Sequence, residues 1–196
     1  MIIEKPTEYR ASHITFDFAQ DSWQINQYWD LRRQIFCEEQ QIFTGSDRDS
    51  IDDKALPIIA ESSYTGFLDQ VVGIVRIDER SPGVWWGGRL GVAKSYRKLA
   101  RFQTSGLFND QHPIYPFTQT IGGALIFKAV STALTLGCRE FYAYVQEQNV
   151  TFFNRMHWQT GDPLHVFGKL HYHMKCDLEF YTPSQKSLYQ LKCIVS

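Results

Sequence analysis

The chain has 196 residues, of which 43% are hydrophobic, and a formal net charge of −1 at pH 7. This charge balance argues against the strongly basic surface that binds nucleic acid or anionic membranes, so neither is an expected partner. No apolar run approaches the roughly 20 residues that span a bilayer. The length predicts one domain over residues 1–196. The four cysteines lack paired spacing and are expected to be reduced thiols of a cytoplasmic protein.

The first part of the chain predicts a strand, a helix and a pair of strands. Residues 14–19 alternate as a strand, and Asp21 with Gln24 three residues later is typical of a helix N-terminus. Further strands are expected over residues 57–64 and 70–78, joined by a hairpin turn. The helix is expected to bury one set of side chains (Ile25, Tyr28, Leu31, Ile35 and Phe36) and to turn a charged set outwards (Arg32, Arg33, Glu38 and Glu39).

A loop with four aspartates follows this helix: Asp47, Asp49, Asp52 and Asp53. A calcium loop of EF-hand type needs glycine at its sixth position and glutamate at its twelfth. Counted from Asp47, these positions hold Asp52 and Ile58, so calcium is not expected here. Turn formation, helix capping and contact with a substrate are the roles left open.

Residues 85–136 carry the strongest functional signal. Residues 89–93 alternate as a strand and are followed by a basic loop and an insertion at about 99–119. Residues 121–136 then predict an amphipathic helix that opens with Gly122 and Gly123. Because glycine has no Cβ, a ligand can approach the N–H groups at the positive end of the helix dipole. This arrangement predicts a site for a diphosphate.

The remaining elements complete an α/β (α+β) pattern. A strand is expected over residues 139–146, a helix over residues 149–158, and one or two strands over residues 164–180. Consecutive strands favour antiparallel hairpins, whereas strand–helix–strand favours a parallel crossover. The sequence therefore predicts a mixed sheet with helices on both faces.

Several segments resemble the GNAT (Gcn5-related N-acetyltransferase) superfamily, whose loop is written Q/R-x-x-G-x-G/A. Arg97, in Ser95-Tyr96-Arg97, is similar to the arginine of the family's YRG segment. Gly122 matches the second motif glycine, whereas Thr120 replaces the first. The run AYVQEQNVTFFNRMHW resembles the family's fifth strand and fourth helix. The whole pattern is closest to bacterial N-acetyltransferases associated with nitrogen starvation, and LRRQIFCEEQ resembles the first helix of acyl-homoserine-lactone synthases.

The resemblance implies a mostly antiparallel sheet of about seven strands, whose fourth and fifth strands splay apart to admit a pantetheine arm. It implies direct transfer of an acetyl group from acetyl-CoA to an amine, which is expected to belong to a small metabolite. A homodimer is expected because many family members are dimers. A longer acyl-CoA or acyl-carrier-protein donor, and a non-catalytic CoA-binding role, are the alternatives. The implied cofactor contacts are Leu90, Gly91, Val92, Arg97, Ile121, Gly122, Gly123, Ala124, Asn149 and Phe153.

The catalytic residues are less closely specified. Family members often use a tyrosine as the acid at the position that Phe153 holds here, so that role cannot be transferred. Tyr142 and Tyr144, on the predicted fifth strand, have the chemistry of an acid, and Tyr144 is the predicted one; His157, one turn beyond Phe153, and the absence of any dedicated acid are the alternatives. A base must take a proton from the amine, and the candidates are His171, Glu39 and Asp53.

Neither a zinc site nor a fixed role for the strand arginines follows from spacing alone. His171 and His173 would share one face of a strand with Cys176 nearby, but no second pair completes a ligand set, so no metal is expected. Arg76 and Arg89 lie in otherwise apolar strands, where an unpaired charge is costly. Each therefore needs an anion, which is an aspartate of the loop or a substrate carboxylate. The predicted substrate-binding residues are Arg33, Arg76 and Arg89.

Overall fold

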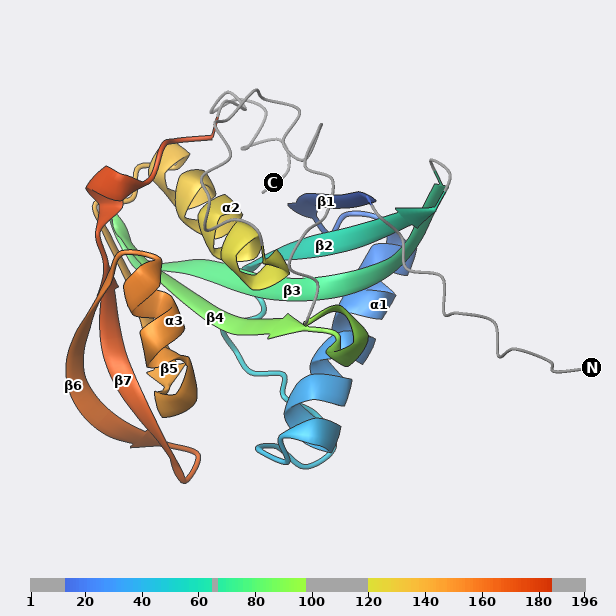
Figure 1. The fold of residues 1–196 in the computed structure, drawn as a ribbon, viewed down its shortest axis with the longest axis horizontal. Coiled ribbons are helices and arrows are strands. Elements are labelled where there is room, and N and C mark those ends of the chain that lie inside the picture. Colours follow the sequence, from blue (N-terminus) through green and yellow to red (C-terminus); the bar gives the residue numbers. More distant parts are fainter. Residues whose placement is uncertain (1–12, 65–66, 98–119, 185–196) are drawn as a thin grey trace, which may run out of the picture.

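Seven strands form one sheet in a computed structural model that describes residues 13–64, 67–97 and 120–184 (Figure 1). Their order is β1-β2-β3-β4-β5-β7-β6, and all neighbours are antiparallel except β4 and β5. The predicted mixed, mostly antiparallel sheet is confirmed, whereas the insertion at about 99–119 lies outside the described residues. The strands are β1 (His13–Phe18), β2 (Leu56–Tyr64), β3 (Phe67–Ser81), β4 (Val84–Val92), β5 (Glu140–Gln146), β6 (Trp158–Val166) and β7 (Lys169–Cys176).

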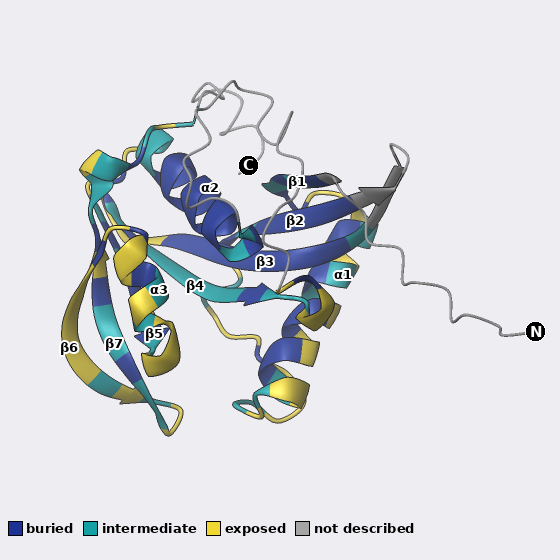
Figure 2. Cartoon of the chain, in the orientation of Figure 1, coloured by how far each residue is buried: buried dark blue, intermediate teal, exposed yellow. Residues whose placement is uncertain are grey.

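Helices cover both faces of the sheet, as predicted (Figure 1). One face carries α1 (Ser22–Arg32), which continues as the π-helix η1 (Arg33–Glu39); the other carries α2 (Ile121–Thr135) and α3 (Val150–Arg155). Short 3₁₀ turns join or follow these elements: η2 (Lys94–Tyr96), η4 (Glu147–Asn149) and η5 (Leu178–Phe180). A larger apolar core lies under α2 and α3, and a smaller one lies under α1 and η1. Figure 2 shows both the centre of the sheet and α2 as buried.

A glycine on β3 lets α2 lie close to the sheet. A Cβ on Gly73 would stand 2.9 Å from both Ile121 Cγ2 and Leu125 Cδ1, so a side chain there would collide with the first turns of α2. The helix begins after the N-cap Thr120 and ends before Gly137, which has a φ of +95°. The helix predicted over residues 121–136 is therefore confirmed to within one residue.

The first helix is oriented differently from the prediction. Arg32 is predicted on the outer side and Ile25 in the core, and both predictions are wrong: Arg32 is 0% exposed, whereas Ile25 is 37% exposed. Arg32 follows Tyr28 by four residues, which places it on the buried stripe by the helical period. The predicted N-terminus is confirmed, since Gln24 Oε1 accepts a hydrogen bond from the Asp21 backbone N–H at 2.9 Å.

The last helix is shorter than predicted. The helix expected over residues 149–158 ends at Arg155, and Trp158 is already the first residue of β6. His157 takes a φ of +60°, which breaks the helix, and Trp158 becomes 4% exposed as it pairs with β7. Pairing with β7 buries the indole between strand and helix. The region 164–180, predicted as one or two strands, holds the end of β6 and all of β7.

Candidate active site

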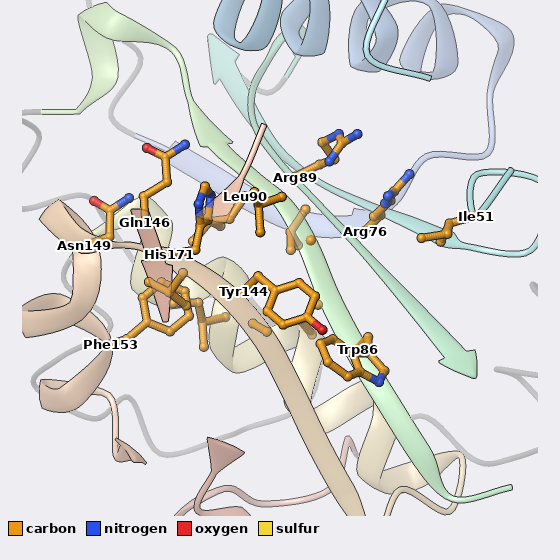
Figure 3. A pocket seen from close by; sticks show the side chains of 18 of the residues that line it. Ile51, Arg76, Trp86, Arg89, Leu90, Tyr144, Gln146, Asn149, Phe153 and His171 are labelled. Atoms are coloured by element: carbon orange, nitrogen blue, oxygen red, sulfur yellow. The ribbon is translucent and has the colours of Figure 1, made fainter. Parts of the chain in front are cut away.

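The sheet opens between its two parallel strands. β4 and β5 pair only over Val84–Gly87 and Glu140–Ala143, and no further pairing joins them within the described residues. A cavity of about 340 Å³ lies at this opening, lined by side chains from both faces of the sheet (Figure 3). Its volume is within the range of small-molecule sites. The opening has the form that the GNAT resemblance implies for the fourth and fifth strands.

On the α2 face the cavity is an apolar chamber, which we define by Ile126, Val130, Phe141, Phe153 and Trp158. All five side chains are buried, with exposures from 0% to 7%. Phe141 and Phe153 each meet Trp158 edge-on, at ring-centroid distances of 5.6 and 5.2 Å. Such a wall suits an apolar group and would penalise a charged one.

A β-bulge in β4 shapes the opposite wall. Arg76 of β3 pairs with Gly88, but Ile74 pairs with Gly91, so β4 carries one more residue than β3 over this stretch. Arg89 lies within the bulge at a φ of +55°. The bulge places Arg89 next to Arg76 on the face that the aspartate loop covers. The predicted alternation holds downstream of the bulge but does not extend across it.

Three arginines and three aspartates form a closed cycle of ion pairs, which we call the ionic ring. Each arginine comes from a different element (α1, β3 and β4), and each contacts two aspartates of the loop. The N–O distances range from 2.6 to 3.1 Å around the ring, in the order Asp47, Arg32, Asp52, Arg76, Asp49, Arg89. The ring carries no net formal charge, and it fastens the loop to the sheet.

The ionic ring shifts the pKa values of its members. Burial raises the pKa of Asp52, but hydrogen bonds from Arg32 and Arg76 outweigh burial and lower that pKa to about 2. Burial also raises the pKa of Asp49, and the hydrogen bond and charge of Arg76 lower it further than burial raises it. The sequence predicts that the anion beside Arg76 and Arg89 is either a loop aspartate or a substrate carboxylate. In the structure, both arginines are paired with loop aspartates.

The predicted donor contacts meet at the end of β4. A Cβ on Gly122 would lie 3.7 Å from Phe152 Cζ and 4.0 Å from Val92 Cγ2, so the first turn of α2 lies beside both β4 and α3. Arg97 donates from Nε to the Val92 backbone oxygen at 2.7 Å, which holds the basic loop at the same place. Leu90 lines the cavity. The structure therefore brings the two halves of the predicted cradle together across the insertion.

The first turn of α2 offers fewer donors than predicted. Thr120 Oγ1 accepts from the Gly123 N–H at 3.1 Å, and the Thr120 backbone oxygen accepts from the Ala124 N–H at 3.0 Å. The N–H groups of Ile121 and Gly122 have no acceptor among the residues that the structure describes. Two amide donors at the positive end of a helix still suit an anion.

His171 is a predicted catalytic residue that lies on the cavity wall (Figure 3). It is 8% exposed and lies on β7 opposite Gln146 of β5. Its Nδ1 is 2.8 Å from the Lys169 backbone oxygen. A carbonyl oxygen can only accept, so Nδ1 carries the hydrogen and Nε2 of the neutral ring keeps its lone pair. Asn149 and Phe153, both predicted donor contacts, line the same cavity.

Tyr144, the predicted acid, lines the cavity within an aromatic cluster. The residue is 44% exposed, and its ring centroid lies 4.9 Å from that of Trp86. In Figure 3 its hydroxyl points towards Trp86, and His171 lies on the other side of the ring. We define the aromatic port as Phe43, Trp86, Tyr144 and Phe167, all of which line the cavity. Because the hydroxyl points away from His171 (Figure 3), Tyr144 is better placed to contact a substrate with its ring than to donate a proton at the strand opening.

Glu39 and Arg33 do not line the cavity. Glu39 Oε2 accepts from Arg97 Nη2 at 2.7 Å, so its carboxylate is already engaged. The side chain of Arg33 is 59% exposed and faces Asp30 and Glu38 at 3.5 and 3.7 Å. Neither side chain is among those that line the cavity with His171.

A bridge of side chains crosses the opening on the α1 face; we define it as Gln40, Phe43, Gln146, Phe167 and Lys169. Gln40 Oε1 accepts from Gln146 Nε2 at 2.9 Å, and the Gln40 backbone oxygen accepts from Lys169 Nζ at 3.0 Å. The Phe43 and Phe167 rings meet edge-on at 4.6 Å. The bridge ties the end of η1 to β5 and the β6–β7 hairpin.

Sequence reasoning missed Arg32 and the bridge for different reasons. The sequence holds a signal for Arg32, because this residue falls on the same helical stripe as Leu31 and Ile35 and a loop with four aspartates follows it. Gln40 had none, since it lies 106 residues before Gln146 and 129 before Lys169. The described residues hold no group of three or more His, Cys, Asp or Glu side chains arranged for a metal ion. None of their helices has both the length and the apolar character needed to cross a membrane.

Searches of protein-family models and of curated sequences give no match, whereas solved structures share the fold. A protein of Lactobacillus plantarum assigned as an N-acetyltransferase aligns over 84% of this chain and 98% of its own, with a TM-score of 0.65 and 17% identity. An acyl-CoA N-acyltransferase of Pseudomonas aeruginosa aligns over 84% and 99%, with a TM-score of 0.60 and 15% identity. The CoA-dependent acyl-homoserine lactone synthase BjaI aligns over 92% and 86%, with a TM-score of 0.59 and 17% identity.

These likenesses define the fold as that of GNAT-type acyltransferases. They include both an acyl-CoA N-acyltransferase and a lactone synthase, and the predicted resemblance to both kinds of protein is confirmed at the level of the fold. At such low identities the likeness shows the fold alone, so activity has to be argued from the site.

Proposed function

We propose that the chain is an N-acyltransferase that moves an acyl group from an acyl-CoA to the amine of a small metabolite. The observation that carries this proposal is the opening between β4 and β5, which holds a cavity with His171 on its wall and the N-terminus of α2 nearby. The fold shared with acyltransferase structures supports it. Acetyl as the acyl group, a cytoplasmic location, a homodimer and the nitrogen-starvation group stay predictions.

The residues present fit an acyl-CoA. The N–H groups of Ile121 and Gly122 would hold the diphosphate. Arg97 would add a donor through Nη1, because its Nε and Nη2 already donate to the Val92 oxygen and to Glu39. Beyond Gly87, the edge of β4 that β5 leaves unpaired would bond the pantetheine amides. Gly122 leaves space at the helix end that a longer side chain would fill. When bound, the thioester supplies an activated carbonyl carbon.

His171 would serve as the base. Nε2 of His171 takes a proton from the ammonium, directly or through a water molecule, so that the neutral amine nitrogen can bond to the thioester carbon. The carbon–sulfur bond breaks, the sulfur leaves with the electron pair as a thiolate, and the nitrogen loses its second proton to solvent as the amide forms. The thiolate then takes a proton from solvent, because a thiolate is stable enough to leave without a dedicated acid.

Paired variants of Gly122 test the donor site. Gly122→Ala should keep CoA affinity within about twofold, because its Cβ would make only ordinary contacts at 3.7 to 4.0 Å. Gly122→Glu should weaken CoA binding at least tenfold by placing a carboxylate beside the diphosphate, while an acidic residue in the first turn keeps the helix stable. Isothermal titration with acetyl-CoA and CoA measures both. Equal affinities in the two variants would remove the cradle assignment.

A variant of His171 tests the chemistry separately. His171→Gln should lower kcat by about 10²-fold to 10⁴-fold, the contribution of a general base, without changing CoA affinity. Thiol release measured over a panel of amines gives the rate. If CoA binds but no amine supports thiol release in the unmodified protein, the chain is a non-catalytic CoA-binding protein instead.

The apolar chamber favours a second candidate, in which the donor carries an acyl chain longer than acetyl. An acetyl group is too small to use a chamber walled by five buried apolar side chains, whereas a chain of several methylenes gains free energy there. Octanoyl-CoA should then have a higher kcat/KM than acetyl-CoA. Ala129→Leu, which adds volume at a buried cavity-lining position, should reverse that order. A preference for acetyl-CoA that Ala129→Leu leaves unchanged would reject this candidate.

A further inference from the structure

The aromatic port lies one strand step from the proposed base. Tyr144 and Gln146 are two residues apart on β5, and Gln146 pairs with His171. Two residues of a strand span roughly 6.6 Å. A ligand ring packed on Tyr144 therefore lies about this distance along β5 from Gln146 and its partner His171. A short two-carbon linker covers about the same separation between an aromatic ring and its amine nitrogen.

The port still has exposed ring surface. Tyr144 is 44% exposed and Phe167 is 61% exposed, whereas large aromatic side chains of a folded domain usually have most of their surface buried. Phe43 holds Phe167 edge-on at 4.6 Å, and Trp86 holds Tyr144 at 4.9 Å. Each exposed ring is therefore fixed by a neighbour. Fixed rings lose little conformational entropy when a flat ligand packs against them.

The charges around the port disfavour an acceptor with several amines. Asp49 is the carboxylate among the described cavity-lining residues, and both Arg76 and Arg89 already bind it. Arg80 also lines the cavity and stacks over Trp86 at 4.1 Å. A second ammonium would thus meet arginines rather than a free carboxylate.

We propose that the acceptor is an arylalkylamine: one primary amine joined by a short linker to a flat aromatic ring. The ring packs in the aromatic port against Tyr144, and the amine reaches the strand opening beside His171. This inference rests on the proposed function and adds the class of acceptor to it. It assigns Tyr144 to acceptor binding through its ring, in place of the predicted role as an acid through its hydroxyl.

The experiment compares 2-phenylethylamine with 2-cyclohexylethylamine, which has the same number of carbons but no π-face. Spermidine serves as the polyamine. Thiol release from acetyl-CoA and from octanoyl-CoA gives kcat/KM for each amine. The aromatic amine should be preferred by about tenfold, the scale of a well-placed aromatic pair, and spermidine should be the poorest acceptor.

Three variants test the role of the ring. Tyr144→Leu should reduce the aromatic preference to about unity. Tyr144→Phe should keep it, because the ring remains, and a hydroxyl that acted as the acid would show instead as a lower kcat for every amine. Tyr142→Leu is the matched control: Tyr142 lies on the same strand and stacks on His173 at 5.0 Å, outside the residues that line the cavity, so the preference should persist.

The outcomes separate this inference from the proposed function. Turnover with equal kcat/KM for the two matched amines, or a preference that Tyr144→Leu leaves intact, overturns the arylalkylamine assignment while leaving the acyltransferase standing. If no amine is turned over, the proposed function fails, and the port is then judged by binding. Titration of the CoA-loaded protein with the same two amines should still show the aromatic one binding about tenfold more tightly, and equal affinities would reject the port as well.

Discussion

Replacement of Arg32 by methionine tests whether the ionic ring holds the loop to the sheet. Arg32 is 0% exposed, and its guanidinium donates to Asp47, Asp52 and the Tyr28 hydroxyl. Methionine keeps a long, flexible side chain but removes the charge and every donor. Asp47 and Asp52 then stay buried, and each has one arginine fewer beside it.

The expected cost follows from breaking a buried ion pair on one side, which is about 3–5 kcal/mol. Because Asp47 keeps Arg89 and Asp52 keeps Arg76, we expect the lower end, about 3 kcal/mol. For a chain of this size that lowers Tm by roughly 6–12 °C. Thermal and urea unfolding followed by circular dichroism measure the change in the free energy of unfolding.

Arg33→Met provides the control, since it removes the next arginine in the chain. Arg33 is 59% exposed with partners at 3.5 and 3.7 Å, so its loss should cost less than about 0.5 kcal/mol. Equal shifts in Tm for the two variants would refute the buried ring as a source of stability.

The stability lost in Arg32→Met should depend on pH. Asp52 has a pKa of about 2 against an ordinary value of 3.8, so its depressed pKa adds stability above about pH 4, and this stability is lost as the pH falls towards 2. The shift corresponds to about 2 kcal/mol. The difference in unfolding free energy between the unmodified protein and Arg32→Met should therefore be full at pH 6–7 and shrink below pH 4. A difference of the same size at pH 3 would contradict this origin.

Three further changes test the surroundings of the opening. Thr120→Ala should lower stability by about 1 kcal/mol through loss of the α2 cap, measured by urea unfolding, whereas Thr120→Ser should not. A double-mutant cycle of Phe43→Leu and Phe167→Leu should give a coupling of about 0.5–1.5 kcal/mol, and a coupling near zero would show that the two rings do not hold the bridge. Gly91→Ala should cost about 1–3 kcal/mol in thermal unfolding, because its Cβ would lie 2.7 Å from Ile35 Cδ1; the additional variant Ile35→Val should recover part of that loss.

The alternation of residues along β4 predicts their faces correctly but does not reveal the β-bulge at the opening. Alternation downstream of the bulge predicts which side chains share a face, and the structure agrees. The bulge itself leaves no mark on that pattern, because it is defined by the register of Gly88 and Gly91 against β3. Only that register places Arg89 beside Arg76.

Sequence alone determined the order of the elements, the parallel crossover through α2 and the cap on α1, because periodicity and capping depend on residues three or four positions apart. It also brought His171 and Gly122 forward as candidates. The tertiary structure decided the partners of Arg32, the separation of β4 from β5, the apolar chamber and the bridge. These depend on side chains that lie far apart in the chain, such as Gln40 and Gln146, 106 residues apart. Their packing is set by the whole fold, and no local pattern encodes it.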